Sequence, residues 1–440
     1  MDETNELDRV LSDGEPGDRD GLTREVNRLL ESQGVRFGGE DDHPFRVDPV
    51  PRVIAADEWE TIAAGLAQRV RTLDLLVDDL YGERTVVAGG VLPERVVAGS
   101  PYFERDLVGI APTAGARISV AGLDLVRGDD GAFRVLEDNV RTPSGMAYAI
   151  AVSEAVASVL GVDRPGSDLA VGIPAALRRC LEATAPDVEG ALVLLTDGAT
   201  NTAYYEHQRL AELASLTLVT PADVRADGEL LRLTSGERVR AVYRRTDTDG
   251  VRDESGELTD LARLLLPSLR AGTVGLANWF GTGVADDKSV YAYVDDLIRH
   301  FLDEEPVLPS VPTYDLAEPD QLEMVLGRLD ELVVKPRDGH GGSGVVVGPT
   351  ATAEELDRAR DEVRRAPELW VAQDVVSLST HATVVDGELQ PRHIDLRPFA
   401  FYDGETVSVP AGGLTRVALQ SGEMVVNSSR DGGGKATWIE

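Results

Sequence analysis

The sequence predicts a mixed protein that combines α+β and α/β architecture, and three patterns lead to that prediction. A glycine-rich hairpin is expected over residues 333–345, a strand–helix–strand unit over residues 191–219, and a long amphipathic helix over residues 57–81. The chain has 440 residues, which is enough for two or three domains with a sizeable core.

Acidic residues dominate the charge of the chain and are spread along its whole length. Asp and Glu number 77 against 43 Lys and Arg, so the formal net charge is -34. This charge argues against nucleic acid or an anionic membrane as the main partner. Lysine occurs only at Lys288, Lys335 and Lys435. Dispersed carboxylates with almost no lysine indicate a halophilic protein, because a salt-rich cytoplasm screens the self-repulsion.

The chain also carries patterns that bear on its location. No apolar run is long enough to cross a bilayer, and the acidic first residues are unlike a signal peptide. The single cysteine, Cys180, excludes an internal disulfide framework and lies in an apolar helix pattern typical of a core residue. We therefore expect a cytoplasmic protein.

The first part of the chain is expected to be scaffold. Residues 1–43 are polar and acidic and are interpreted as a mobile arm with one helix near residues 22–30. The helix over residues 57–81 repeats apolar residues at spacings of three and four. Asp57 and Glu60 are placed to form a capping box at its start.

A hairpin of two strands, over residues 118–126 and 133–140, carries polar residues that suggest a metal site. Asp124 is expected to face Glu137, and Glu137 shares a face with Asn139 because side chains alternate along a strand. Two carboxylates and an amide oxygen are hard ligands suited to Mg²⁺. The alternative is a solvated acidic hairpin face.

The turn that follows the hairpin contains Arg141 and Ser144 and leads into a helix that ends near Gly161. The N-terminus of this helix, near Ser144 and Gly145, is a place where an anion of the substrate could bind.

The strand–helix–strand unit over residues 191–219 predicts a second group of candidate residues. Ligands bind beyond the carboxyl ends of the strands in such units. Asp197, Thr200 and Asn201 follow the first strand and are therefore candidate substrate contacts. A hairpin over residues 230–243 ends in Arg244 and Arg245, which could bind a substrate carboxylate or form a surface ion pair.

The segment 275–288 is a glycine-rich approach to a helix with Lys288 in its first turn. A lysine at that end opposes the helix dipole, so a rare lysine there suggests contact with a nucleotide phosphate. The alternative is a solvated lysine.

The hairpin over residues 333–345 also combines glycines with a lysine, which suggests a second contact with a nucleotide phosphate. Apolar runs flank a loop whose glycines let the backbone approach phosphate oxygens, and Lys335 ends the first strand. The loop residues singled out are Gly341, Gly342, Ser343 and Gly344, with His340 as the histidine to test. The alternative is a tight turn without a ligand.

The last part of the chain is expected to complete this site. The strand over residues 370–376, which includes Gln373, is placed to present edge backbone groups to an adenine. Asp386 and Gly387 form a strong hairpin turn signal. The glycine-rich segment 412–440 is expected to fold back onto the site.

Four motifs together resemble a known family. The segments 135–145, 277–288, 334–345 and 413–418 with 426–429 are similar to the circularly permuted ATP-grasp proteins of type 2, and more distantly to the synthetase domain of glutathionylspermidine synthase. The resemblance implies an ATP-grasp fold in which two α+β subdomains hold ATP between them. A permuted order is implied because the metal-ligand hairpin precedes the glycine-rich loop.

The resemblance also implies roles for individual residues. Lys288, Lys335 and the loop 341–344 would contact the ATP phosphates, and Gln373 would line the adenine. Mg²⁺ would be held by Asp124, Glu137 and Asn139. The distant relatives carry an arginine two positions before that aspartate, where this chain has Gly122. Arginines inside the matching motifs, expected to be catalytic, are Arg141, Arg397 and Arg416.

The function implied is an ATP- and Mg²⁺-dependent carboxylate–amine ligase that acts through an acylphosphate on small-molecule or peptide substrates. Two alternatives stay open, an ATP-dependent phosphotransferase and a non-catalytic ATP-grasp binding module. The domains expected after the arm are a scaffold with the metal-ligand hairpin (44–185), a βαβ preATP-grasp-like substrate domain (186–285) and a nucleotide-binding part (286–440).

Overall fold

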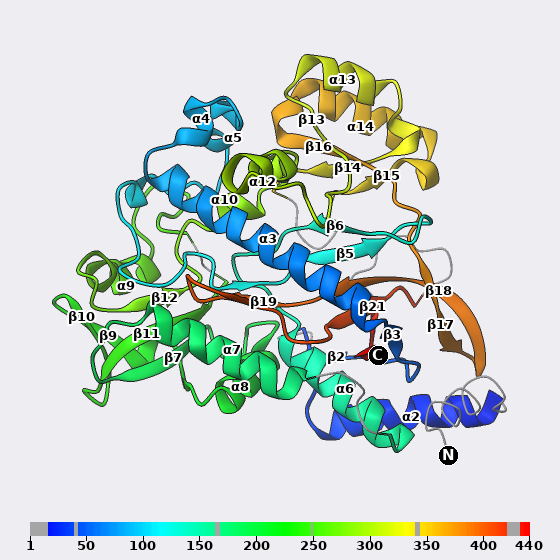
Figure 1. Ribbon diagram of the computed structural model, residues 1–440, viewed down its shortest axis with the longest axis horizontal. Helices are drawn as coiled ribbons and strands as arrows, with labels where there is room; N and C mark the ends of the chain where they lie inside the picture. The colour runs from blue at the N-terminus through cyan, green and yellow to red at the C-terminus, as the bar shows by residue number, and fades with distance from the viewer. Residues whose placement is uncertain (1–15, 39–42, 163–167, 248–249, 339–343, 420–431) are drawn as a thin grey trace.

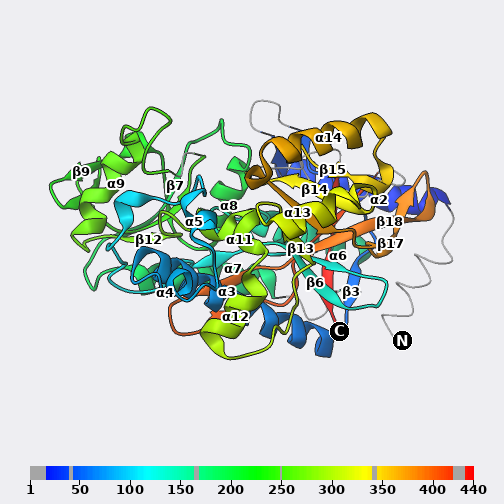
Figure 2. The same ribbon diagram turned by 90° about the horizontal axis from the view of Figure 1, so that it is seen from above.

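A computed structural model of the chain describes residues 16–38, 43–162, 168–247, 250–338, 344–419 and 432–440. Figures 1 and 2 show a small domain at one end, which contains α13 and α14, and a sheet that contains β7 at the other. A central sheet and the long helix α3 (Ala56–Tyr81) lie between them. None of the described helices is long and apolar enough to span a membrane.

The sheet at one end contains the predicted strand–helix–strand unit. Its strands are ordered β8-β7-β11-β10-β9, with β12 also paired to β11. β7, β8, β11 and β12 run parallel, whereas β9 and β10 form antiparallel pairs. Helices α7 and α8 pack on one face and α9 on the other, so the parallel strands are buried on both sides. The bounds are β7 Ala191–Thr196, α8 Tyr204–Leu213, β8 Thr217–Val219, β9 Val224–Asp227, β10 Leu230–Leu233, β11 Arg238–Arg245, α9 Asp260–Arg270, β12 Gly275–Ala277 and α7 Leu169–Thr184.

The central sheet joins two distant parts of the chain. Its order is β22-β21-β18-β5-β6, with β17 paired to β18. The hairpin of β5 (Asp124–Arg127) and β6 (Phe133–Glu137) thus lies beside strands from the C-terminal part: β17 Thr380–Val385, β18 Glu388–Arg397, β21 Leu414–Val417 and β22 Gly433–Lys435. Asp386 and Gly387 have φ values of 50° and 76° and form the predicted turn between β17 and β18.

The small domain is a four-stranded antiparallel sheet ordered β13-β16-β14-β15, covered by two helices. Its strands are β13 Thr313–Asp315, β14 Leu332–Pro336, β15 Val346–Val347 and β16 Trp370–Asp374, and its helices are α13 Pro319–Leu326 and α14 Ala353–Arg365. The pairing of β14 with β15 confirms the predicted hairpin. The prediction that β16 presents an edge is wrong over its paired residues, because β13 and β14 occupy its two sides.

The long helix α3 crosses in front of the central sheet in Figure 1. Its apolar stripe is fully buried, with Ile62, Leu66, Val70, Leu73 and Val77 at most 1% exposed. The predicted capping box is wrong. The helix begins one residue earlier, with Ala55 as the N-cap and no side-chain cap.

The N-terminal segment is more ordered than the mobile arm expected for residues 1–43. Helix α2 (Pro16–Ser32) packs against α6 (Met146–Leu160), and its Val26 and Leu30 are 0% exposed. β1 (Arg36–Phe37) pairs with β2 (His43–Pro44). Residues 16–38 are therefore part of the core, whereas residues 1–15 lie outside the described part of the chain.

The remaining elements complete the body. The predicted strand over residues 118–126 is divided at Gly122 and Leu123 into β4 and β5, which belong to different sheets.

Cys180 on α7 is buried, as predicted, and burial raises the pKa of its thiol to about 12. The other bounds are α4 Thr85–Ala88, α5 Glu94–Ala98, β4 Val120–Ala121, α10 Gly283–Asp286, α11 Lys288–Tyr291, α12 Val294–Leu302, β19 Ala400–Tyr402 and β20 Val407–Ser408.

The C-terminus folds back into the core. β23 (Thr437–Ile439) pairs in parallel with β3 (Arg52–Ile54), and Trp438 is 1% exposed. The fully buried Lys435 forms an ion pair with Asp48 and donates to the carbonyl oxygen of Ala382 at 2.9 Å. Lys435 is therefore a structural lysine in the central sheet.

We expect Lys435→Met to lower the free energy of unfolding by about 3–5 kcal/mol, because it leaves a buried carboxylate without its charged partner. Asp48 would keep its bonds from the backbone N–H groups of Val50 and Val384. The control is Arg179→Met, which breaks an ion pair of a half-exposed arginine with Asp403 and should cost less than about 1 kcal/mol. Denaturant titration measures both, and equal losses would contradict the prediction.

Candidate nucleotide site

A pocket lies between the central sheet and the small domain. Strand β6 forms one wall, β14 and β16 form another, and α10 and α11 close a side. Charged and polar residues converge in it from segments far apart in the sequence. The lining residues are Leu136, Glu137, Asp138, Asp286, Lys288, Tyr291, Thr313, Lys335, Val371 and Gln373.

Two lysines face this pocket, each held by a neighbour. Lys335 on β14 donates through Nζ to Oε1 of Gln373 on β16 at 2.6 Å. Lys288 begins α11, and its Nζ lies 3.1 Å from Oε1 of Glu137. Gln373 also donates to Oγ1 of Thr313 at 3.0 Å. The structure thus brings together four of the residues predicted for the nucleotide and the metal.

Lys335 brings a positive charge to the lining of the pocket. Burial lowers the pKa of its ammonium to about 8, opposed by the charge of Glu137 and assisted by the charge of Lys288. Its described side-chain hydrogen bond goes to a neutral amide. A phosphate oxygen beside Nζ would favour the protonated, charged form of Lys335.

Arg141 stands at the margin of the pocket. Its Nε donates to Oδ2 of Asp286 at 2.8 Å, and its guanidinium lies 4.4 Å from the centre of the Tyr102 ring. Burial raises the pKa of Asp286 to about 6, against the lowering influence of Arg141. The sequence analysis missed Asp286 and Tyr102, because only the fold brings them to Arg141.

Asp124 lies opposite Glu137 in the register of β5 and β6, as predicted, but its carboxylate has other partners. Arg397 donates to both of its oxygens at 2.6 and 2.8 Å, and Arg416 contacts it at 2.9 Å. Burial alone would raise the pKa of Asp124, yet the two arginines lower it to about 2. Asp124 therefore does not fit the predicted role of metal ligand, because arginines occupy its oxygens.

Glu137 fits this role better than Asp124, because its side chain lines the pocket and is 36% exposed. Asn139 is not among the lining residues, and its role as a metal ligand stays a prediction. Among the described residues, no three His, Cys, Asp or Glu side chains gather as a metal site. One carboxylate and one amide suit Mg²⁺, which takes few protein ligands when substrate phosphates supply the rest.

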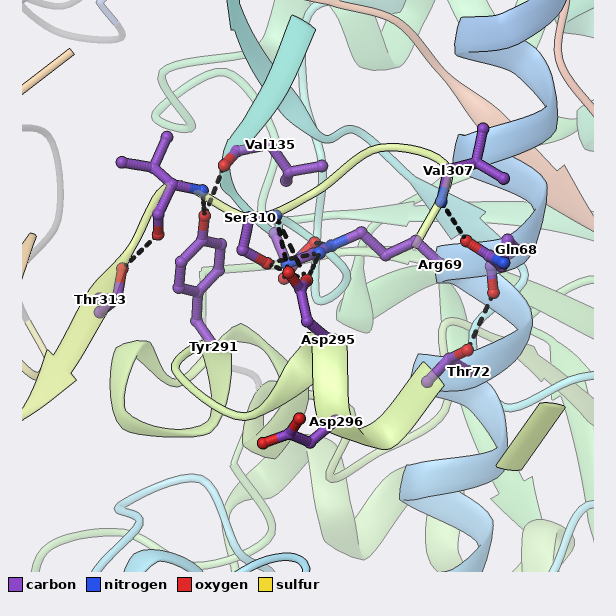
Figure 3. A network of polar contacts seen from close by, with 12 residues as sticks. Gln68, Arg69, Thr72, Val135, Tyr291, Asp295, Asp296, Val307, Ser310 and Thr313 are labelled. Atoms are coloured by element: carbon purple, nitrogen blue, oxygen red, sulfur yellow. Dashed lines mark hydrogen bonds and ion pairs between the residues drawn. The ribbon is translucent and has the colours of Figure 1, made fainter. Parts of the chain in front are cut away.

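Behind β6, a polar network fixes the strand from its other side (Figure 3). Arg69 of α3 binds both oxygens of Asp138 at 2.7 and 2.8 Å and donates to Oγ of Ser310 at 2.9 Å. The hydroxyl of Tyr291 donates to the carbonyl oxygen of Val135 and accepts from the N–H of Val311. The network therefore ties β6 to the segment that enters the small domain. Nothing in the sequence marked Arg69 or Asp138.

The family profile described as circularly permuted ATP-grasp type 2 matches residues 51–418. The chain belongs to this family. The match confirms the fold implied by the four motifs, in which the Glu137 strand precedes the glycine-rich loop.

Several relatives of this ATP-grasp protein cover most of its length. A Frankia casuarinae protein named "Putative glutamate--cysteine ligase 2-2" is 45% identical over 430 residues, which are 95% of this chain and 49% of that protein. An uncharacterised protein of Mycobacterium tuberculosis (strain H37Rv) is 42% identical over 427 residues, 94% of this chain and 77% of the relative. The chain spans about half the length of the Frankia relatives that it matches.

A solved structure shares the fold. A glutathione synthetase-like effector from Globodera pallida, in its apo form, superposes with a TM-score of 0.63 over 96% of each chain. Its sequence identity is 11%, so the likeness shows the fold alone.

The predicted substrate residues of the βαβ unit lie in this ATP-grasp protein at the carboxyl end of β7, as expected, but they bind each other. Asn201 donates to Oδ1 of Asp247 at 2.8 Å and accepts from the N–H of Ala203. Asp197 accepts from the N–H of Asp247 at 2.6 Å. The structure does not bring them into the pocket, and a substrate role for them stays a prediction.

The two arginines that were expected either to bind a substrate carboxylate or to form a surface ion pair are buried. Arg245 pairs with Oε1 of Glu206 at 3.0 Å, and Arg244 lies over the ring of Phe280. The other oxygen of Glu206 accepts from the N–H groups of Gly145 and Ala147 at the start of α6. A carboxylate of the chain itself therefore occupies these N–H groups and pairs with Arg245. A substrate role for Ser144, Arg244 and Arg245 stays a prediction.

The glycine-rich loop is only partly described. His340, Gly341, Gly342 and Ser343 lie outside the described residues. Gly344 has a φ of +73°, and a Cβ there would come within 2.7 Å of Cγ of Pro336. Glycine is therefore required where the loop returns to β15.

We expect the affinity for ATP–Mg²⁺ to fall about tenfold between pH 7 and pH 9, because Lys335 with a pKa of about 8 loses its proton over that range. Bound phosphates would raise the pKa of Lys335, so binding is expected to be strongest at pH values below the pKa of the free protein. Isothermal titration at both pH values measures the change. In Lys335→Met this dependence should disappear, and an unchanged dependence would contradict the assignment.

Proposed function

We propose that the protein is an ATP- and Mg²⁺-dependent carboxylate–amine ligase that acts through an acylphosphate. The convergence of Lys288, Lys335 and Glu137 in one pocket supports this proposal most directly. Two cations and a carboxylate match the charges of a triphosphate and its metal.

The chemistry requires positioning and charge neutralisation. A substrate carboxylate oxygen attacks the γ-phosphorus of ATP, and the bond to the β-phosphate oxygen breaks to release ADP. The amine then attacks the acyl carbon, loses a proton and expels inorganic phosphate. Lys288 and Lys335 hold the phosphates, and Glu137 with Asn139 would hold Mg²⁺, which supplies charge neutralisation when bound. Gln373 accepts a hydrogen bond from Lys335 and would align that lysine.

The three arginines that were expected to be catalytic make different contacts. Arg141 pairs with the pocket residue Asp286 and so lies beside the pocket. Arg397 and Arg416 neutralise Asp124 and connect β18 and β21 with the hairpin that carries Glu137. We propose that these two position the hairpin.

The names of the relatives support a substrate class. Two Frankia proteins are named as glutamate–cysteine ligases, which join an amino-acid carboxylate to an amino-acid amine. We propose that the substrates are amino acids or peptide-like molecules. The formal net charge of -34 further supports a salt-rich cytoplasm as the place where the protein acts. The βαβ sheet would serve as a preATP-grasp-like substrate domain.

Assays of ADP release separate this function from its two alternatives. A ligase releases ADP only when a carboxylate and an amine are both supplied. A phosphotransferase needs a single acceptor, and a binding module binds ATP–Mg²⁺ without turnover. Amino acids and small peptides supplied alone and in pairs, in potassium-rich buffer, provide the test.

In the same assay, Lys335→Ala should raise the ATP concentration needed for half-maximal ADP release about 10- to 100-fold, because a charge-assisted contact with phosphate is lost. The matched control is Arg328→Met, a half-exposed cation of the small domain. Unchanged turnover in Lys335→Ala would remove this lysine from the site.

We expect Glu137→Gln to raise the Mg²⁺ concentration for half-maximal turnover about 10- to 100-fold, because a charged ligand becomes neutral. The control is Asp130→Asn, at the exposed tip of the same hairpin. Circular dichroism verifies that both variants fold. An unchanged Mg²⁺ titration would exclude Glu137 as a ligand.

A further inference from the structure

A buried ion pair joins the two segments that carry the pocket lysines. The guanidinium of Arg337 donates through Nε to both oxygens of Asp287 at 2.8 and 2.9 Å, and its Nη2 lies 2.8 Å from Oδ2. Arg337 is 5% exposed and Asp287 is 0% exposed. Neither residue lines the pocket.

The positions of the two residues give the pair its significance. Arg337 follows Lys335 by two residues, where β14 ends, and its backbone N–H donates to the carbonyl oxygen of Leu369. Asp287 immediately precedes Lys288, and its carboxylate caps α11 by accepting from the N–H of Ser289 at 2.9 Å. One contact therefore sets the distance between the backbones of both lysines.

The pair also spans the junction between the small domain and the body. Arg337 donates to the carbonyl oxygen of Val96 on α5, so one guanidinium holds β14, α5 and α11 together. Gly99 leaves room for it, since a Cβ at that position would lie 3.0 Å from Nη1.

Stability alone is a weak reason for such a pair, because buried ion pairs are often no better than apolar residues of similar size. An apolar contact would join the segments without fixing their spacing, whereas a bidentate guanidinium–carboxylate pair has a defined geometry. Two like charges must be held near each other before a triphosphate arrives, so defined spacing has a use here.

We infer that Arg337 is a positioning residue that, through Asp287, holds Lys288 and Lys335 at the separation a triphosphate requires. This inference rests on the proposed function, since it needs the pocket to bind ATP. It adds a residue that touches no nucleotide yet sets affinity for its phosphates.

The test compares Arg337→Lys and Arg337→Met with wild type by isothermal titration, using ATP–Mg²⁺ and AMP as probes. Arg337→Lys keeps the charge and removes the bidentate geometry. We expect affinity for ATP–Mg²⁺ to fall about 10- to 100-fold in both variants, with affinity for AMP within about twofold of wild type. A loss confined to the triphosphate is not expected from general damage to the fold.

The matched control is Arg95→Met. Arg95 also bridges α5 and the small domain, through Asp315 at 2.6 Å and Glu318, but is half-exposed and outside the pocket lining. This variant should bind ATP–Mg²⁺ as wild type does.

Each other outcome has a defined meaning. Failure of wild type to bind ATP–Mg²⁺ would overturn the proposed function itself. If wild type binds, then unchanged ATP affinity in Arg337→Lys, or equal losses for ATP and AMP, would overturn the positioning role. Unfolding of both Arg337 variants by circular dichroism would show that the pair maintains the fold, and would also overturn it.

Discussion

The ion pair of Arg69 with Asp138 is the contact on which the candidate site depends. Asp138 directly follows Glu137 at the end of β6, and Arg69 on α3 holds its carboxylate, so this pair fixes the end of the strand that carries Glu137 into the pocket. The same guanidinium binds Ser310, on the segment that leads into β13. One side chain of α3 thus aligns two parts of the site, the strand that carries Glu137 and the segment that enters the small domain.

Other junctions in the molecule are built in the same way. Arg245 with Glu206 joins β11 to α8 and to the start of α6, and Arg416 with Asp395 and Asp124 joins three strands of the central sheet. In each case the cation is buried beside its carboxylate. Lys335 differs, because its described side-chain bond is to an amide. The pocket thus holds two of the three lysines of a strongly acidic chain, beside the carboxylates of Glu137 and Asp286.

Several residues of the candidate pocket could be predicted from the sequence. Lysine is so rare here that Lys288 and Lys335 stood out, and hairpin periodicity placed Glu137 on a strand. The partners of buried charges could not be predicted. Asp124 and Arg397 are far apart in sequence and meet only through the pairing of β5 with β18. The contact of Glu206 with the start of α6 could not be predicted for the same reason, and β16 is internal because β13 pairs on its free side.

The composition of the central sheet has a consequence for how the chain folds. Its β5–β6 hairpin, near the first quarter of the sequence, pairs with strands that follow residue 380, and β3 pairs with β23. The entropy of closing such long loops is lost before the contacts form, which slows folding. During synthesis the hairpin edge and the apolar surface that Trp438 covers stay exposed until the final strands are made. The permuted order therefore makes the nascent chain prone to aggregation and dependent on protection until the sheet closes.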